Sequence, residues 1–155
     1  MPAVIHFYAV NEAHGEFSNF APYPIFLHGK RWPTSEHYFQ AQKFAGTPHA
    51  EEIRRAKKPR IAADMGRDRK RPLRRDWESV KDSVMLDALR AKFTQHADLR
   101  DLLLATDDAE LVEHTANDSY WGDGGDGSGK NRLGALLMRV RDELRAADDP
   151  TRPHR

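Results

Sequence analysis

The chain has no cysteine, and this absence excludes disulfide bonds, cysteine metal sites and cysteine nucleophiles. It also lacks any apolar run close to the roughly 18–20 residues that a membrane-spanning helix needs. Residues 1–6 show neither a basic region nor a long apolar core, so no signal peptide is predicted. We therefore expect a cytoplasmic protein whose 155 residues form a single domain.

Patterns typical of metal or triphosphate sites are missing or incomplete. The eight histidines do not pair at helical i, i+4 spacing, and no Ser-His-Asp ordering is present. The glycine-rich loop 124–131 nearly matches a phosphate loop, but Asn131 replaces the Ser or Thr that holds magnesium, and no apolar strand precedes the loop. Acidic residues lie in and next to this loop, but it lacks the glutamate that completes an EF-hand, so a calcium site is not predicted. What is left is a flexible loop that opens a helix and can approach a phosphate or sugar closely.

Charge is unevenly distributed along the chain. The stretch from Arg54 to Arg75 holds eleven basic residues against Asp64 and Asp68, about +9, so the rest of the chain sums to about −8. Such a field favours phosphates of a nucleotide or a nucleic acid. Most of these side chains also fit a simple surface role, and the stretch has neither aromatic residues nor a helix-turn-helix pattern. Arg67, after Gly66 at a helix end, is the best single candidate for a phosphate contact.

Periodicity and turn residues predict a mostly helical α+β fold with a small antiparallel β-sheet, made from the N-terminal strands and one late strand. One domain is expected over residues 1–147 and a disordered tail over 148–155. Helices are expected at 34–44, 48–57, 59–66, 77–95, 98–105 and 132–146, and strands at 4–9, 25–27, 31–32 and 110–115.

The helix that begins after Pro33 carries the most chemistry. At 100° per residue, Glu36, Gln40 and Lys43 fall on one line, where a buried helix normally has apolar residues. Phenylalanines flank the line, and Thr34 is placed to cap the helix. One interpretation is a solvated face on which Glu36 only complements the helix dipole. The other is a carboxylate presented in a cleft.

A second stretch, residues 117–123, sets Trp121 beside a glycine and two acids. This pattern suits a stacking surface for a flat ring or a sugar, and it equally suits a core anchor. Carboxylates, aromatic walls and cations together suit cleavage of a glycosidic bond in a phosphorylated ribose compound, where a carboxylate stabilises an oxocarbenium-like transition state or activates water.

Ordered motifs along nearly the whole chain, from about residue 6 to 145, resemble the YbiA-like or NADAR superfamily. The matching segments are Phe17-Ser18-Asn19-Phe20, Ser35 to Phe44, Met65-Gly66-Arg67, Asp76-Trp77 with Lys81 and Met85, Lys92-Phe93, Asp118 with Trp121-Gly122, and Gly129 to Gly134 followed by Leu137, Met138 and Arg141.

This resemblance implies a YbiA-like helical fold and N-glycosidase activity without metal or redox cofactor. One reaction that it implies is hydrolysis of the C–N bond of phosphoribosylaminopyrimidine intermediates of riboflavin biosynthesis, as metabolite damage control. The other is removal of ADP-ribose from modified guanine in DNA. For that reaction the basic stretch 54–75 would bind the nucleic acid. A non-catalytic binder of NAD or ADP-ribose is the alternative from another class. By motif, Glu36 and Asp123 are candidate catalytic acids. The candidate substrate-binding residues are Asn19, Phe20, Lys43, Arg67, Trp77, Lys81, Trp121 and Asn131.

Overall fold

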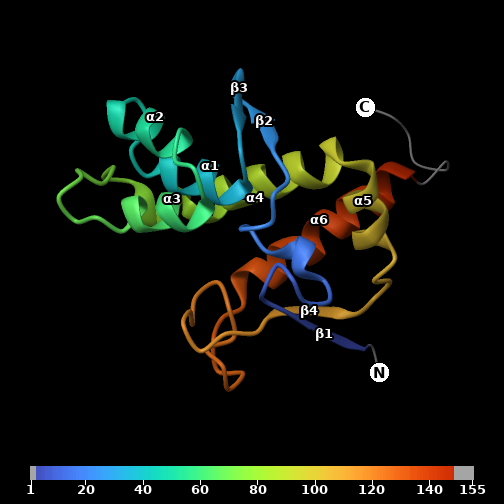
Figure 1. Cartoon of the computed structure of the whole chain (residues 1–155). Helices are drawn as coiled ribbons and strands as arrows, with labels where there is room; N and C mark the ends of the chain where they lie inside the picture. The colour runs from blue at the N-terminus through green and yellow to red at the C-terminus, as the bar shows by residue number, and fades with distance from the viewer. Residues whose placement is uncertain (1–2, 149–155) are drawn as a thin grey trace. The chain divides into compact units, whose positions relative to one another are not determined.

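The computed structural model describes residues 3–148 (Figure 1). It divides into two compact units, one formed by Asn19–Gln95 and the other by Met1–Ser18 with His96–Arg155. In chain order the elements are β1 (Val4–Phe7), a 3-10 helix η1 (Gly15–Phe17), β2 (Ile25–Leu27), β3 (Lys30–Trp32), α1 (Ser35–Gln42), α2 (Pro48–Arg54), α3 (Pro59–Gly66), α4 (Trp77–Gln95), α5 (Ala97–Leu104), β4 (Glu110–Glu113) and α6 (Arg132–Asp148).

The unit formed by Asn19–Gln95 surrounds α1 with the hairpin and three helices. β2 and β3 pair antiparallel, with Ile25 opposite Trp32, and the turn between them places His28 and Gly29 at positive φ. α1 contacts α2, α3, α4 and β3. It is buried on every side, because Ser35 through Ala41 are all buried. A helix in this position must satisfy each polar side chain that it carries.

The other unit packs two helices and a short parallel sheet. β1 and β4 run parallel, with Val4 opposite Glu110 and Phe7 opposite Glu113. α6 packs on β4 and also contacts α5. The approach of α6 to β4 is close, because a Cβ on Gly134 would lie 2.0 Å from the Leu111 carbonyl oxygen. Only glycine fits at that position of the helix.

The predicted fold class is confirmed, and α3 and α4 have the predicted bounds to the residue. The prediction of one antiparallel sheet is wrong in its arrangement: the strands form two separate two-stranded sheets, and β1 pairs with β4 in parallel. α6 continues to Asp148, where the tail was expected to begin, and the rest of that tail, 149–155, lies outside the described residues. Within residues 3–148, no helix combines the length and apolarity needed to cross a membrane.

Candidate functional site

The polar line on α1 is buried. Glu36 is 7% exposed and Gln40, one helical turn later, is 4% exposed. Gln40 Nε2 donates to Glu36 Oε1 at 2.8 Å, and the Glu36 amide donates to the Asn19 carbonyl at 3.2 Å. Thr34 caps the helix as predicted, since its side chain accepts from the His37 amide at 3.2 Å. The interpretation of a solvated face is therefore wrong for Glu36 and Gln40.

Lys43, at the end of α1, lies between backbone and aromatic rings. Its Nζ donates to the Gly66 carbonyl at 3.3 Å and lies 5.8 Å from the ring centres of both Phe39 and Trp77. Burial lowers the pKa of Lys43, and it outweighs the nearby Glu36 carboxylate, which raises the pKa. An ammonium that has lost part of its hydration in this way is a strong partner for an anionic ligand.

Two further cations act on Lys43. After burial and Glu36, the charge of Arg67 lowers the pKa of Lys43, and Lys81 lowers it as well. Lys81 pairs with Glu78 at 2.5 Å on the first turns of α4, whereas Arg67 is exposed and makes no ion pair within residues 3–148. Three cations around one point attract a phosphate more strongly than an isolated lysine would.

The aromatic wall of this site is formed by Phe39 and Trp77. Their ring centres lie 5.1 Å apart at 58°, and each residue is 5% exposed. The indole of Trp77 therefore packs as part of the core as well as facing Lys43. A ligand that stacks on it would contact the small part of the ring that the core leaves uncovered.

Asn19 lies at the start of the same unit and is held from two sides. Its Oδ1 accepts from Ser35 Oγ at 2.7 Å, and its Nδ2 donates to Met85 Sδ at 3.3 Å. Its backbone carbonyl accepts the Glu36 amide. Asn19 thus fixes the first turn of α1, and with it the carboxylate. The neighbouring Phe20 is half-buried.

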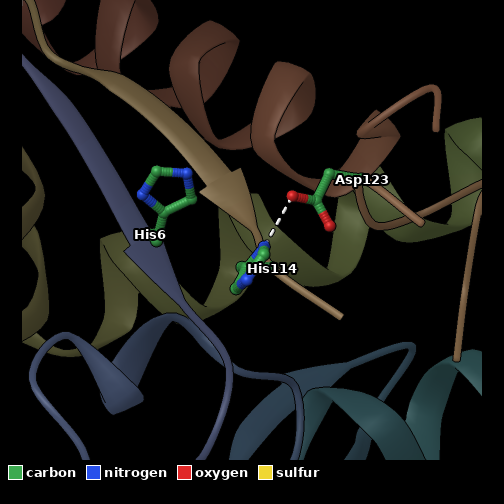
Figure 2. Close-up of side chains that lie close together, drawn as sticks. All are labelled: His6, His114 and Asp123. Atoms are coloured by element: carbon green, nitrogen blue, oxygen red, sulfur yellow. Dashed lines mark hydrogen bonds and ion pairs between the residues drawn. The ribbon is translucent and has the colours of Figure 1, made fainter. Parts of the chain in front are cut away.

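Asp123 belongs to the other unit, in the glycine-rich loop. Its Oδ2 lies 2.7 Å from His114 Nδ1 (Figure 2), and its Oδ1 accepts from the amides of Thr115 at 3.0 Å and Gly125 at 2.8 Å. The His114 hydrogen bond, ahead of the two backbone amides, lowers the pKa of Asp123 to about 2. Gly125, at φ 88°, takes the left-handed conformation that turns its amide to this oxygen.

Among residues 3–148, His6, His114 and Asp123 form a group that could hold a metal ion, with candidate ligand atoms within 4.8 Å of one another. His6 extends from β1, and His114 follows directly after the paired strand β4; their rings meet edge-on at 5.2 Å (Figure 2). Two of the three groups already bind each other, however, and Asp123 accepts three hydrogen bonds. The arrangement favours a hydrogen-bonded His114–Asp123 pair that supports the loop over a resident metal.

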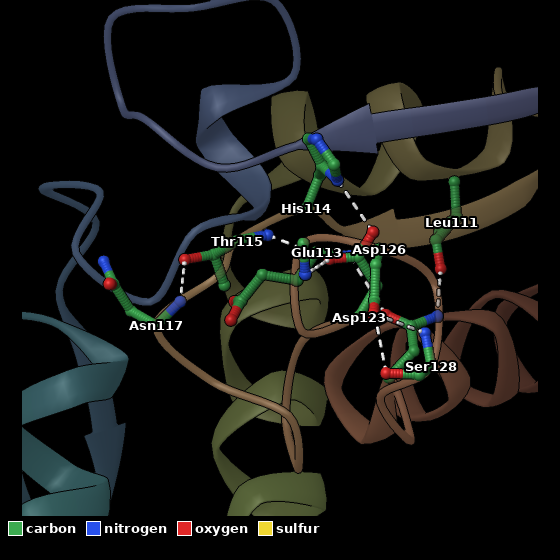
Figure 3. A network of polar contacts seen from close by, with 10 residues as sticks. Leu111, Glu113, His114, Thr115, Asn117, Asp123, Asp126 and Ser128 are labelled. Atoms are coloured by element: carbon green, nitrogen blue, oxygen red, sulfur yellow. Dashed lines mark hydrogen bonds and ion pairs between the residues drawn. The ribbon is translucent and has the colours of Figure 1, made fainter.

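Asn131, predicted to bind substrate, uses both ends of its amide on β4. Its Oδ1 accepts from the Glu113 amide at 3.0 Å, and its Nδ2 donates to the Leu111 carbonyl at 2.9 Å. Figure 3 shows the polar network around Asp123, which includes Leu111 and Glu113. Trp121 is half-buried, with its ring edge-on to Tyr120 at 4.9 Å. Trp121 therefore has the partial exposure that a stacking surface requires, and Asn131 supports the strand.

Acids neutralise part of the basic stretch. Arg54 binds Glu51 through two hydrogen bonds, and Arg71 binds Glu52 at 2.9 Å. Further pairs join Arg55 to Glu51, Arg60 to Asp64, Arg71 to Asp68, and Arg74 to Asp76. The local field is thus weaker than the residue count of the stretch suggests.

The ten predicted site residues fall into two groups. Trp121, Asp123 and Asn131 belong to the unit that contains α6. The other seven belong to the unit Asn19–Gln95, which contains α1: Asn19, Phe20, Glu36, Lys43, Arg67, Trp77 and Lys81.

Three residues that contact the predicted site residues are not predicted from the sequence to belong to the site: Gln40, Gly66 and His114. The i, i+4 spacing of Glu36 and Gln40 was the available signal for the first.

The fold and the α1 site define a small, mostly helical α+β protein that buries a carboxylate beside cations and aromatic rings. The family model of the NADAR domain matches residues 6–145, so the chain belongs to the NADAR domain family.

Known proteins agree with this placement. Over 141 residues the chain is 64% identical to N-glycosidase YbiA of Escherichia coli K12, an alignment that covers 91% of this chain and 88% of that protein. It is 45% identical over 144 residues to riboflavin biosynthesis protein VVA0006 of Vibrio vulnificus, covering 93% of this chain and 39% of that longer protein. The NMR structure of the E. coli protein YbiA superposes with a TM-score of 0.90 at 60% identity, covering 99% of this chain and 92% of that one. The predicted family is confirmed.

Proposed function

We propose that this chain is an N-glycosidase that hydrolyses the C–N ribosyl bond of phosphoribosylaminopyrimidine intermediates of riboflavin biosynthesis. Two relatives support the two parts of the proposal, one named an N-glycosidase and one a riboflavin biosynthesis protein. The single observation that carries it is the buried Glu36 carboxylate on α1, with the half-buried Lys43 ammonium at the C-terminal end of the same helix. The carboxylate would stabilise positive charge at the reacting carbon, and the cations would bind the ribose phosphate.

The reaction needs one bond to break and one to form. The bond from ribose C1′ to the amine nitrogen breaks with its electron pair on nitrogen, and a water oxygen bonds to C1′. One proton of that water ends on the amine, and the hydroxyl stays on the sugar. As C1′ loses the nitrogen it becomes oxocarbenium-like, and in this proposal Glu36 stabilises this charge or accepts the water proton.

Electrostatics can supply a useful share of the rate. Opposite unit charges about 4 Å apart interact by about 4 kcal/mol at an effective dielectric constant of about 20, which corresponds to about a 10³-fold acceleration. Lys43, Arg67 and Lys81 would bind the 5′-phosphate, and the Phe39–Trp77 wall would contact the ribose or the base. In this proposal Asp123, held ionised by its low pKa, acts through the loop it organises rather than as a proton donor.

Removal of ADP-ribose from modified guanine in DNA is the alternative within the same enzyme class. It would draw on the basic stretch, but the pairs formed by Arg54 with Glu51 and by Arg71 with Glu52 leave fewer free cations for a phosphate backbone. A DNA substrate would also make activity fall steeply with added salt. A non-catalytic binder would use the same cations and rings, with Glu36 as a hydrogen-bond partner of the ribose.

One experiment separates these readings. The protein is incubated with a phosphoribosylaminopyrimidine and, separately, with ADP-ribosylated DNA, and mass spectrometry follows which C–N bond breaks. Release of ribose 5-phosphate and the free aminopyrimidine is the expected result. Release of ADP-ribose alone would assign the DNA reaction, and tight ADP-ribose binding in calorimetry with no hydrolysis of either substrate would assign the binder.

A further inference from the structure

The buried side-chain amide of Gln40 donates a hydrogen bond to Glu36. It is 4% exposed and lies one turn of α1 beyond the carboxylate. Its Nε2 donates to Glu36 Oε1 at 2.8 Å. A donor in this position favours the ionised carboxylate and restricts the rotation of its side chain.

The other end of the same amide is left without a partner. Gln40 Oε1 is buried and accepts no hydrogen bond from any residue in 3–148. Turning the amide over would place this oxygen against Glu36 Oε1, and two acceptors would then face each other. A buried amide oxygen without a hydrogen-bond partner lowers the stability of the fold. A buried amide with this defect therefore needs an explanation, such as a functional role.

Gly66 packs closely against the oxygen end of this amide. A Cβ on Gly66 would lie 1.9 Å from Gln40 Oε1 and 2.9 Å from Gln40 Cβ, so the glycine of α3 lies directly against the side chain. The carbonyl of the same glycine accepts from Lys43 Nζ at 3.3 Å. One residue of α3 therefore restrains both the neighbour of Glu36 and the cation further along α1.

Charged groups also surround this end of α1, and the charges of Glu36 and Lys43 act on each other. Lys43, Arg67, Glu78 and Lys81 are the charged groups that act together around this end of α1. The acids of α2 pair elsewhere, Glu51 with Arg54 and Lys30, and Glu52 with Arg71.

We propose that Gln40 is a positioning residue, held by Gly66, that keeps the Glu36 carboxylate ionised and oriented toward the substrate. This inference rests on the proposed function for its catalytic consequence, but not for its effect on the titration of Glu36. The structural alternative is that Gln40 only fills space between α1 and α3. The two differ in what happens when the amide is replaced by an apolar side chain of the same length.

The first test measures the carboxylate itself. Carbon-13 NMR follows the titration of the Glu36 side chain in wild type, in Gln40→Met and in the matched control Gln42→Met, a half-buried glutamine on the same helix. We expect the midpoint of Glu36 to rise by about one pH unit in Gln40→Met and to stay unchanged in Gln42→Met. An unchanged midpoint in a folded Gln40→Met protein overturns the proposal. Should that variant not fold, Gln40→Glu is used, for which a second carboxyl beside Glu36 predicts a larger rise.

The second test measures the reaction. In Gln40→Met we expect kcat to fall about 10- to 100-fold with KM changed by less than about threefold, and the acid limb of the pH profile to move to higher pH. On a Glu36→Gln background the same substitution should change kcat less than about twofold, because Gln40 would have no carboxylate to act on. Equal losses on both backgrounds would instead assign Gln40 a role independent of Glu36.

The outcomes keep the two proposals apart. If Glu36→Gln is as active as wild type, the catalytic assignment fails whatever Gln40 does. If Glu36→Gln is inactive while Gln40→Met has wild-type kcat and pH profile, only the positioning role fails. Gly66→Ala should reproduce the Gln40→Met titration, since its methyl group would displace the amide.

Discussion

Asp123 accepts a hydrogen bond from His114 Nδ1 across 2.7 Å, and this contact is the largest cause of its pKa of about 2. Because the carboxylate also holds the amides of Thr115 and Gly125, the ionised side chain is a structural part of the loop. A proton added to it would disturb all three contacts together.

Asp123 should therefore make the protein sensitive to acid. Its pKa is depressed in the folded chain, so its stabilising contribution is present above the ordinary value of 3.8 and is lost as the pH falls through about 2. Asp123→Asn should lower Tm at neutral pH by about 3–8 °C and flatten the fall of stability between about pH 4 and 2. Thermal unfolding followed by circular dichroism across this range checks it, with the exposed Asp101→Asn as control. Equal acid sensitivity in wild type and Asp123→Asn would contradict the assignment.

Glu36→Gln should separate activity from folding. The substitution keeps the size of the side chain, but it removes the negative charge that we propose stabilises the reacting carbon, so we expect kcat to fall by about 10²–10⁴-fold. Tm should not fall by more than about 3 °C, since glutamine can still accept from Gln40. Steady-state hydrolysis of the phosphoribosylaminopyrimidine gives the answer. Glu12→Gln, on an exposed loop residue, controls for the loss of one acid, and equal activity of Glu36→Gln and Glu12→Gln would refute the catalytic role.

Lys43→Met should weaken substrate binding. Removing the ammonium leaves Arg67 and Lys81 to face the phosphate, so KM should rise about 10- to 100-fold, by analogy with loss of a buried charge-assisted contact. Because burial lowers the pKa of Lys43, binding by wild type should also weaken at a pH below the ordinary lysine value of 10.5, as the ammonium loses its proton.

The control for Lys43 is Lys57→Met, which removes an exposed lysine from the basic stretch. Lys57→Met should leave KM unchanged, and it should also leave unchanged the pH at which substrate binding weakens on the alkaline side. A rise in KM of the same size for both variants would show that overall charge, and not the position of Lys43, determines binding.

Local signals predicted much of the fold. Pro59 and Gly66 bound α3 at the predicted residues, and Thr34 caps α1, because these effects act over one or two turns. The pairing of β1 with β4 was not predictable in the same way, since more than a hundred residues separate the strands and neither carries a signal for direction. Long-range partners are set by packing, which the local pattern of residues does not encode.

The site was predicted less evenly. The line Glu36, Gln40 and Lys43 follows from helical geometry, and the structure buries the first two as a pair. The hydrogen bonds of Asp123 and Asn131 depend on a loop with glycines and one asparagine at positive φ, whose course no spacing rule fixes. The chemistry of these side chains was visible in the sequence, but their partners were not.

Asn131 gives the clearest test of a structural role at a residue first predicted to bind substrate. Its amide contacts the Glu113 amide and the Leu111 carbonyl, and it adopts φ 49°, a conformation that alanine tolerates poorly. Asn131→Ala should lower Tm by about 4–10 °C. Asn131→Gly should lower Tm by less, because glycine accepts this φ. Asn131→Asp should lower Tm by an intermediate amount, because the aspartate keeps only the contact with the Glu113 amide. If Asn131 only stabilises β4, KM of the folded variants should change less than about threefold. A large rise in KM with Tm unchanged would instead return Asn131 to the substrate pocket.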